Sequence, residues 1–192
     1  EGYIEKSLQQ VERMKKMENK KIYKILVLGR AYYESSHLIT RYVDNLYISE
    51  NFWPGTDFRS KEIFVDGKFF KFQIWQVVGS SPRIGRSYYL RNLQGVIIIF
   101  DVTKEDSFEY AKYFLDDIKK NAECDLDVIL IGDESGPDRA IIKEEAEKFA
   151  NDNNMHYFDI SIRDNRGVDE AFTYLATQIH HHYIYKNSKA NF

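Results

Sequence analysis

The stretch that decides the fold is IYKILVLGRAYYESSHL, residues 22–38. Its first half is an almost continuous apolar run, which is typical of a strand buried on both faces of a sheet. Gly29 follows, and a short loop then leads into residues 35–45, which we expect to be helical. A strand, a glycine, a short loop and a helix in this order form the layout of a phosphate-binding loop.

Such a loop requires the pattern G-x-x-x-x-G-K-[ST]. Gly29 and Ser36 fit this frame, but Glu34 and Ser35 stand where the second glycine and the lysine belong. Glycines let backbone N–H groups surround a phosphate, and the lysine neutralises part of its charge. The spacing is therefore either a coincidence or a sign of a nucleotide site that has been dismantled.

The rest of the chain alternates between expected strands and helices. Two strands are joined by Asp66-Gly67, a strong signal for an antiparallel hairpin. The other strands alternate with helices, which favours parallel pairing. We therefore expect an α/β fold with a six-stranded, mixed but mostly parallel sheet flanked by helices. The expected strands are 22–28, 59–65, 69–75, 95–101, 126–132 and 155–160, and the expected helices are 35–45, 106–121, 140–152 and 167–184.

Composition excludes several classes of function. Lysine and arginine number 27 against 30 acidic residues, so no strong field favours nucleic acid or anionic lipid as a partner. The single cysteine, Cys124, rules out an internal disulfide framework and is typical of a reducing, cytoplasmic location. No apolar run approaches roughly 18 residues, so we expect no direct membrane anchor in this segment.

Five segments resemble, in order and at nearly the family's spacing, the signature segments of Rab-type small GTPases of the Ras superfamily. The resemblance covers about residues 22–179 and implies the small-GTPase fold, guanine nucleotide with Mg²⁺ as ligand, GTP hydrolysis as activity, and effector proteins in vesicle trafficking as partners. The segments are IYKILVLG (22–29), PGTDF (54–58), KFQIW (71–75), SYY (87–89) and IIIFDVT (97–103).

The same resemblance implies which positions hold the nucleotide, and most of them are altered. In the phosphate loop the family has glycine at the positions of Tyr32 and Glu34 and lysine at that of Ser35. In the two switch segments the family has threonine at Trp53, aspartate at Gln76 and glutamine at Ser80, whereas Gly79 is kept. The guanine-reading NKxD pattern becomes Asp133, Glu134, Ser135 and Gly136, and the later SAK pattern becomes Ser161, Ile162 and Arg163.

We therefore interpret the chain as a degenerate pseudo-GTPase with no catalytic residues, no metal and no cofactor. It would act as a protein-interaction or regulatory module at endomembranes reached through partners. One alternative is an atypical GTPase that still binds GTP or GDP with Mg²⁺ through a remodelled loop. Another is a structural or dimerisation domain. Tyr32, Tyr33 and Trp53 are expected to fill the empty pocket.

Three further polar features have simpler explanations. Ser36 occupies the position of the family's magnesium ligand, but a serine at a helix start is usually a cap or a surface residue. Asp101 is expected to cap the following turn. The run His180-His181-His182 is expected to be a solvated helix end, because adjacent helical side chains point in different directions.

Protein partners are expected at an aromatic surface. The family's effector-binding triad falls on Phe58, Trp75 and Tyr88, and aromatic anchors of this kind dominate many interfaces. Packing of the switch segments against the sheet explains part of their presence.

The domain organisation is predicted to be a leader or linker helix at 1–20, the Rab-like domain at 21–185 and a tail at 186–192. Residues 1–20 place apolar side chains at helical spacing, and EGYIEKSLQQV resembles DEAFTYLATQI (169–179). The leader is thus either the last helix of a preceding GTPase domain in a tandem protein or an ordinary helix that packs on this domain.

Overall fold

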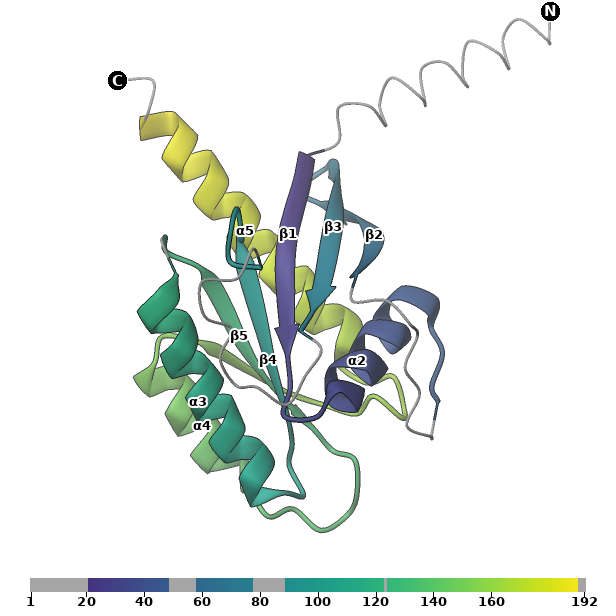
Figure 1. Ribbon diagram of the computed structural model, residues 1–192. Helices are drawn as coiled ribbons and strands as arrows, with labels where there is room; N and C mark the ends of the chain where they lie inside the picture. Colours follow the sequence, from purple (N-terminus) through teal and green to yellow (C-terminus); the bar gives the residue numbers. More distant parts are fainter. Residues whose placement is uncertain (1–20, 49–57, 78–88, 123, 190–192) are drawn as a thin grey trace, which may run out of the picture.

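The computed structural model describes residues 21–48, 58–77, 89–122 and 124–189, so the predicted leader helix lies outside the described part. One six-stranded sheet with the order β2-β3-β1-β4-β5-β6 runs through the domain, with helices on both of its faces (Figure 1). The strands are β1 (Lys21–Leu28), β2 (Phe58–Val65), β3 (Lys68–Gln76), β4 (Gly95–Asp101), β5 (Asp127–Asp133) and β6 (His156–Ile160). The helices are α2 (Tyr32–Asp44), α3 (Glu105–Asn121), α4 (Lys143–Asp152) and α5 (Val168–Lys189).

Pairing within the sheet is parallel except at one edge. β2 is antiparallel to β3, whereas β1 pairs in parallel with β3 and β4, and β5 pairs in parallel with β4 and β6. Asp66 and Gly67 form the hairpin turn with φ values of 50° and 77°, the left-handed conformation that such a turn requires. The predicted mixed, mostly parallel sheet is confirmed.

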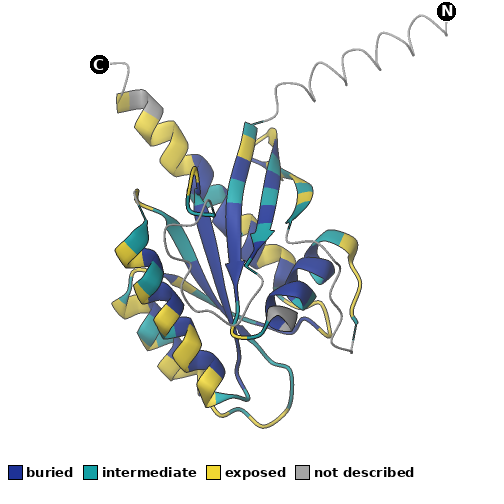
Figure 2. Ribbon diagram, in the orientation of Figure 1, coloured by how far each residue is buried: buried dark blue, intermediate teal, exposed yellow. Residues whose placement is uncertain are grey.

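Alternation along the strands divides the core into two layers. Ile25 and Val27 of β1 face α2 and α5, and Leu26 and Leu28 face α3 and α4. Successive side chains of a strand point to opposite faces, so a strand between two helical layers must be apolar throughout. Figure 2 shows the result, with the central strands buried between the helices, whereas residues 181–186 of α5 are exposed.

Three helix boundaries differ from those expected, and two of the differences have clear causes. α2 begins at Tyr32 rather than at residue 35, because residues 32–34 include no glycine and adopt right-handed helical backbone readily. α4 begins at Lys143 rather than 140, because the N–H groups of Ala140 and Ile141 both bond to the carbonyl of Val102. α5 continues past residue 184 to Lys189.

The histidine run does not behave as a uniformly solvated helix end. His180 is only 4% exposed, and its Nδ1 lies 2.9 Å from the Tyr23 hydroxyl on β1. His181 and His182 are exposed and contact Asp66 and Asp127. The expectation was therefore wrong for His180, because α5 packs on the sheet at this point and buries the imidazole against Tyr23 of β1 and Phe70 of β3.

Candidate functional site

Parallel pairing gathers the predicted site residues at one edge of the sheet. Asp101 and Asp133 are the last residues of β4 and β5 and lie directly opposite each other in the ladder. Gln76 ends β3 beside Val27 of β1. Ligands of open α/β sheets bind at this edge, where the strands have their carboxyl ends.

After Gly29 the chain enters α2, and a backbone hydrogen bond closes its first turn. A phosphate-binding loop would instead leave its N–H groups free for the ligand. The N–H of Glu34 bonds to the carbonyl of Ala31 at 3.0 Å, so this amide is already satisfied. The Glu34 side chain is 6% exposed and folds back against Gly29. A Cβ at Gly29 would lie 3.0 Å from Oε2 of Glu34, so glycine makes this close approach possible.

Ser107 of α3 holds the Glu34 carboxyl group. The Ser107 hydroxyl accepts a bond from the N–H of Asp101 at 3.0 Å and donates to Oε1 of Glu34 at 3.0 Å. Burial raises the pKa of Glu34 to about 7. The Ser107 hydroxyl and the backbone N–H groups of Ala31 and Arg30 offset part of this rise, whereas the Asp101 carboxylate adds to it.

Gln76 bonds to the two serines of the predicted phosphate loop. Its Nε2 donates to the hydroxyls of Ser35 and Ser36 at 2.8 and 2.7 Å, and all three side chains are buried. Ser36 is therefore neither a cap nor a surface residue, in contrast to the expectation. An amide N–H₂ group points at the hydroxyls, and an amide donor cannot coordinate a cation.

Asp101 caps the turn that follows β4, as predicted. Its Oδ1 accepts bonds from the N–H and hydroxyl of Thr103 and from the Ser135 hydroxyl, and Oδ2 pairs with Lys104. Burial alone would raise the pKa of Asp101, but these hydrogen bonds outweigh it and lower the pKa below its usual value.

Asp133 joins β5 to the loop after β6. Its Oδ1 accepts a 2.9 Å bond from the N–H of Ile162. Burial raises the pKa of Asp133 to about 6, and Asp101 and Glu134 add to the rise, whereas Ile162 and Arg163 oppose it. Gly136 has ordinary space around it, with Thr103 Cγ2 at 3.5 Å from a Cβ built there.

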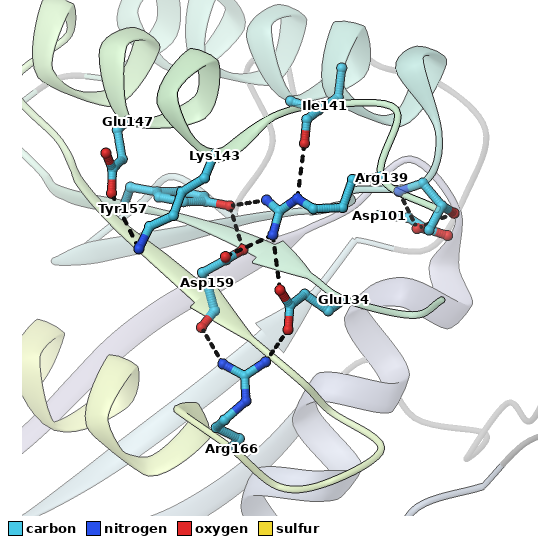
Figure 3. Close-up of polar contacts among 10 residues, drawn as sticks. Asp101, Glu134, Arg139, Ile141, Lys143, Glu147, Tyr157, Asp159 and Arg166 are labelled. Atoms are coloured by element: carbon cyan, nitrogen blue, oxygen red, sulfur yellow. Dashed lines mark hydrogen bonds and ion pairs between the residues drawn. The ribbon is translucent and has the colours of Figure 1, made fainter. Parts of the chain in front are cut away.

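Two arginines hold Glu134, the residue after Asp133. Arg139 donates to Oε1 of Glu134 at 2.9 Å and to Oδ2 of Asp159 at 2.8 Å, and Arg166 pairs with Oε2 of Glu134 (Figure 3). Tyr157 donates to Asp159 at 2.8 Å, and the hydrogen bond to Asp159 raises the pKa of Arg139 above its usual value. The network joins the loop after β5 to β6 and to the start of α5.

A cavity of about 320 Å³ lies among these groups. Three carboxyl groups and two cations line it: Lys104 pairs with Asp101, and Arg163 lowers the pKa of Asp133. The cavity is therefore lined by charges of both signs and by apolar side chains. Its lining residues are Glu34, His37, Tyr47, Ile99, Phe100, Asp101, Lys104, Asp133, Ser135, Ile162 and Arg163.

Comparison with known proteins identifies the relatives of this chain. A sequence model described as the Ras family matches residues 24–181. The Ras-related protein Rab-13 of Mesocricetus auratus is 32% identical over 166 residues, which covers 82% of this chain and 80% of that protein. Rab-2B of Dictyostelium discoideum is 32% identical over 163 residues with the same coverage. Rab-1 of Theileria annulata is 34% identical over 161 residues, with 81% and 73% covered.

The chain is a Rab-like member of the Ras family. The Ras-family match spans all the described site residues, from Gly29 to Arg166. The sheet order and the single antiparallel edge strand agree with this membership.

Several predicted positions of the Rab-like domain lie outside the described residues. These are Trp53, Gly79, Ser80 and Tyr88, together with the side chains of Tyr32 and Tyr33. The self-filled pocket predicted for Tyr32, Tyr33 and Trp53 therefore stays a prediction.

Two members of the predicted effector triad are adjacent. Phe58 of β2 and Trp75 of β3 pair across the hairpin with ring centroids 4.9 Å apart, and Trp75 also contacts Tyr89 edge-on at 6.1 Å. Phe58 and Trp75 are half-buried, so they pack against each other and still present ring surface outward.

Sequence reasoning missed Ser107 and the Arg139 network. Ser107 lies 73 positions from Glu34 and reads in sequence as an ordinary helix-start residue. Arg139, Asp159 and Arg166 carry no motif. The only signal in the sequence was that Asp159 stands between two apolar residues, Phe158 and Ile160, of an expected strand.

Within residues 21–48, 58–77, 89–122 and 124–189, no three His, Cys, Asp or Glu side chains are placed to hold one metal ion. None of the described helices is long and apolar enough to cross a membrane.

Proposed function

We propose that this Rab-like domain is a pseudo-GTPase, a protein-interaction and regulatory module in vesicle trafficking that works without guanine nucleotide. The observation that carries the proposal is the Glu34 carboxyl group, which lies buried against Gly29 and bonded to Ser107. A phosphate bound by this loop would have to enter the space that this side chain fills.

Electrostatics support the proposal. A phosphate oxygen about 4 Å from an ionised Glu34 would be repelled by roughly 4 kcal/mol at an effective dielectric of 20. This corresponds to about a thousandfold in affinity. Ser35 stands where the family has the lysine that attracts the phosphate. The hydroxyls of Ser35 and Ser36 each accept a hydrogen bond from Gln76.

The base end of the site supports the same conclusion. Gly136 offers no carboxylate to the N–H groups of a guanine, and Glu134 is engaged by Arg139 and Arg166. A site loses specificity by orders of magnitude when a buried polar partner of the ligand disappears. The ion pairs of Arg139 and Arg166 connect the loops around the position at which the family binds the base.

Partners are proposed to bind the aromatic surface of Phe58, Trp75 and Tyr88. Without a residue that senses the terminal phosphate, this surface would be constitutively set rather than switched by hydrolysis. Attachment to endomembranes would then pass through protein partners, one of which would be a preceding GTPase domain if the chain is half of a tandem protein.

The test is the nucleotide content of the purified chain. We expect denatured protein to release no stoichiometric GDP or GTP on ion-exchange chromatography. We also expect the melting temperature to stay unchanged when GTP and Mg²⁺ are added, since a ligand that does not bind the folded state cannot stabilise it. Recovery of about one equivalent of guanine nucleotide would favour the atypical GTPase instead.

A further inference from the structure

One part of the sheet turns apolar side chains outward. α3 and α4 cover this face over β4, β5 and β6, but no described helix covers it over β2, β3 and the start of β1 (Figure 1). Phe64, Phe69 and Ile22 are 59%, 56% and 47% exposed there. Phe64 and Phe69 pair across the hairpin with ring centroids 4.9 Å apart, and Ile22 pairs with Lys71, two residues from Phe69. Contiguous exposed apolar side chains of this kind mark a contact with another segment.

A hollow of about 480 Å³ continues this open sheet face toward Trp75. Side chains of β1 and β3, among them Lys24 and Trp75, form its floor, and the segment before β4, with Arg91, forms one wall. Nζ of Lys24 donates to the carbonyl of Arg91 at 2.9 Å, which holds this segment against β1. Lys24 and Arg91 therefore place positive charge on the β4 side of the open sheet face. On the hairpin side Glu62 and Lys71 lie opposite each other, so their charges balance.

The segment that enters β1 carries a matching apolar stripe. Residues 1–20 lie outside the described part of the chain and join the sheet at the start of β1, beside the open sheet face. Over residues 3–14 the sequence places four apolar side chains on one side of a helix about 18 Å long. The open sheet face spans about 20 Å from Phe69 to Trp75. The leader stripe, as we call these side chains, consists of Ile4, Leu8, Val11 and Met14.

Charge and chain direction select the same orientation on this face. At about 100° per residue, Glu1, Glu5 and Glu12 all fall on one flank of the leader stripe. If a right-handed helix runs antiparallel to β1 with the stripe toward the sheet, this acidic flank lies on the β4 side, near Lys24 and Arg91. A parallel helix would turn the glutamates toward the hairpin instead.

Connectivity also requires the antiparallel direction. Residues 15–20 separate the stripe from β1, and six residues reach at most about 20 Å. This length suffices for the chain to reverse at the start of β1. A parallel helix would end near Trp75, and the same six residues would have to span the whole open sheet face.

We propose that residues 3–14 form a helix that docks on the open sheet face of their own domain, antiparallel to β1. The leader stripe lies on Ile22, Phe69 and the hollow beside Trp75, and the acidic flank faces the cations on the β4 side. An amphipathic helix laid into an apolar groove is a common mode of recognition. The docked helix covers part of the surface at which we propose that partners bind, so a partner must displace it. This inference goes beyond the proposed function and does not depend on nucleotide.

The test is amide hydrogen exchange of the full chain, followed by mass spectrometry of peptides that cover residues 1–20. Isolated helices shorter than about 12–15 residues are marginal in water, so protection of this segment requires docking. We expect the amides of residues 7–14 to exchange at least about tenfold more slowly than those of an unstructured peptide, at dilute and concentrated protein alike. Exchange at the unstructured rate would overturn the proposal. Protection that increases with protein concentration would also overturn it, because a second copy would then cover the segment.

Matched variants locate the contact. Leu8→Asp should remove most of the protection, because it places a charge in the leader stripe, whereas Gln9→Asp, on the opposite side of the helix, should leave it. Phe69→Gln should have the same effect as Leu8→Asp. Its control is Ile142→Gln, which alters a side chain that is 58% exposed at the start of α4. Protection that survives Phe69→Gln would place the leader on another surface and overturn the proposal.

Charge reversal tests the orientation. Arg91→Glu should speed the exchange of residues 7–14, and Glu5→Arg with Glu12→Arg should restore slow exchange in that background. Lys148→Glu, which alters an exposed lysine of α4, should change nothing. Exchange that stays fast in the charge-reversed triple variant would overturn the antiparallel arrangement. Nucleotide content is measured separately, so failure of this proposal leaves the pseudo-GTPase proposal standing.

Discussion

At the scale of single residues, Glu34 is the charged side chain buried where β1 leads into α2. Its position in the first turn of α2 directs the carboxyl group back toward Gly29, where Ser107 can donate to it. Under the proposed function this side chain fills the space of a phosphate. Burial of the carboxylate has a cost in the free energy of folding, because the ionised group is desolvated.

This cost predicts a pH dependence that Glu34→Gln should remove. The folded pKa of about 7 lies above the ordinary pKa of 4.5 for the carboxyl group in the unfolded chain. The folded state therefore holds the proton more tightly, and the Glu34 contribution to stability is complete below pH 4.5 and lost as the pH rises through 7. A shift of this size corresponds to roughly 3 kcal/mol at pH 8.

We expect Glu34→Gln to raise the free energy of unfolding at pH 8 and to change it little at pH 4.5, as measured by urea denaturation at both pH values. Glu144→Gln, which alters an exposed carboxylate, is the control. An equal effect of Glu34→Gln at the two pH values would mean that the carboxyl group is not protonated on folding.

At the scale of elements, the Arg139 network holds the loop after β5 in place. The side chains of Arg139, Glu134 and Asp159 are 23%, 31% and 15% exposed, so solvent screens their attraction only in part. Tyr157 adds a bond to Asp159, and Gly132 is required because a Cβ there would clash with the Tyr157 hydroxyl. The loop is therefore ordered by side chains of β6 and its flanking segments.

We expect Arg139→Met to lower the free energy of unfolding by about 2 kcal/mol, because Asp159 and Glu134 would lose a shared cation while remaining partly buried. Lys148→Met is the matched control, since the Lys148–Asp152 pair is 75% and 58% exposed and an exposed pair is worth about 0–1 kcal/mol. Chemical denaturation measures both. Similar losses in the two variants would show that the network contributes no more than a surface pair.

At the scale of the whole molecule, the proposed loss of nucleotide binding involves both ends of the site, while the sheet that carries the site is intact. Under this proposal Glu34, Ser35 and Gln76 change the phosphate end, and Glu134 and Gly136 change the base end. The two ends lie on different strands and loops. Repair of one end therefore cannot restore the other.

This separation predicts the result of reversing the phosphate loop. Glu34→Gly with Ser35→Lys removes the anion and returns the cation, so we expect weak phosphate affinity with GTP and ATP bound about equally. Preference for GTP should require Gly136→Asp and Asp133→Asn as well, because only these return side chains that face a guanine.

Calorimetric titration of both nucleotides against the double and quadruple variants measures the two effects. Tight, GTP-selective binding by the double variant would show that residues other than Asp133 and Gly136 read the base.

The sequence by itself determined the architecture of this domain. Runs such as residues 96–100 are apolar throughout because both faces of a central strand are buried. Asp66-Gly67 marks the hairpin because both residues adopt positive φ. Local patterns of this kind do not depend on distant contacts. The segments shared with Rab proteins could be recognised for the same reason.

Only the tertiary structure decided which partners the side chains of Glu34, Gln76 and His180 have. The bonds of Glu34 to Ser107 and of Gln76 to Ser35 and Ser36 join residues 40 or more positions apart, and no local pattern encodes such partners. The burial of His180 against Tyr23 has the same origin, because it depends on how α5 packs on the sheet. Periodicity reports which face of an element is buried, but the partner of a buried polar group is set by the packing of whole elements, where desolvation makes each remaining hydrogen bond count.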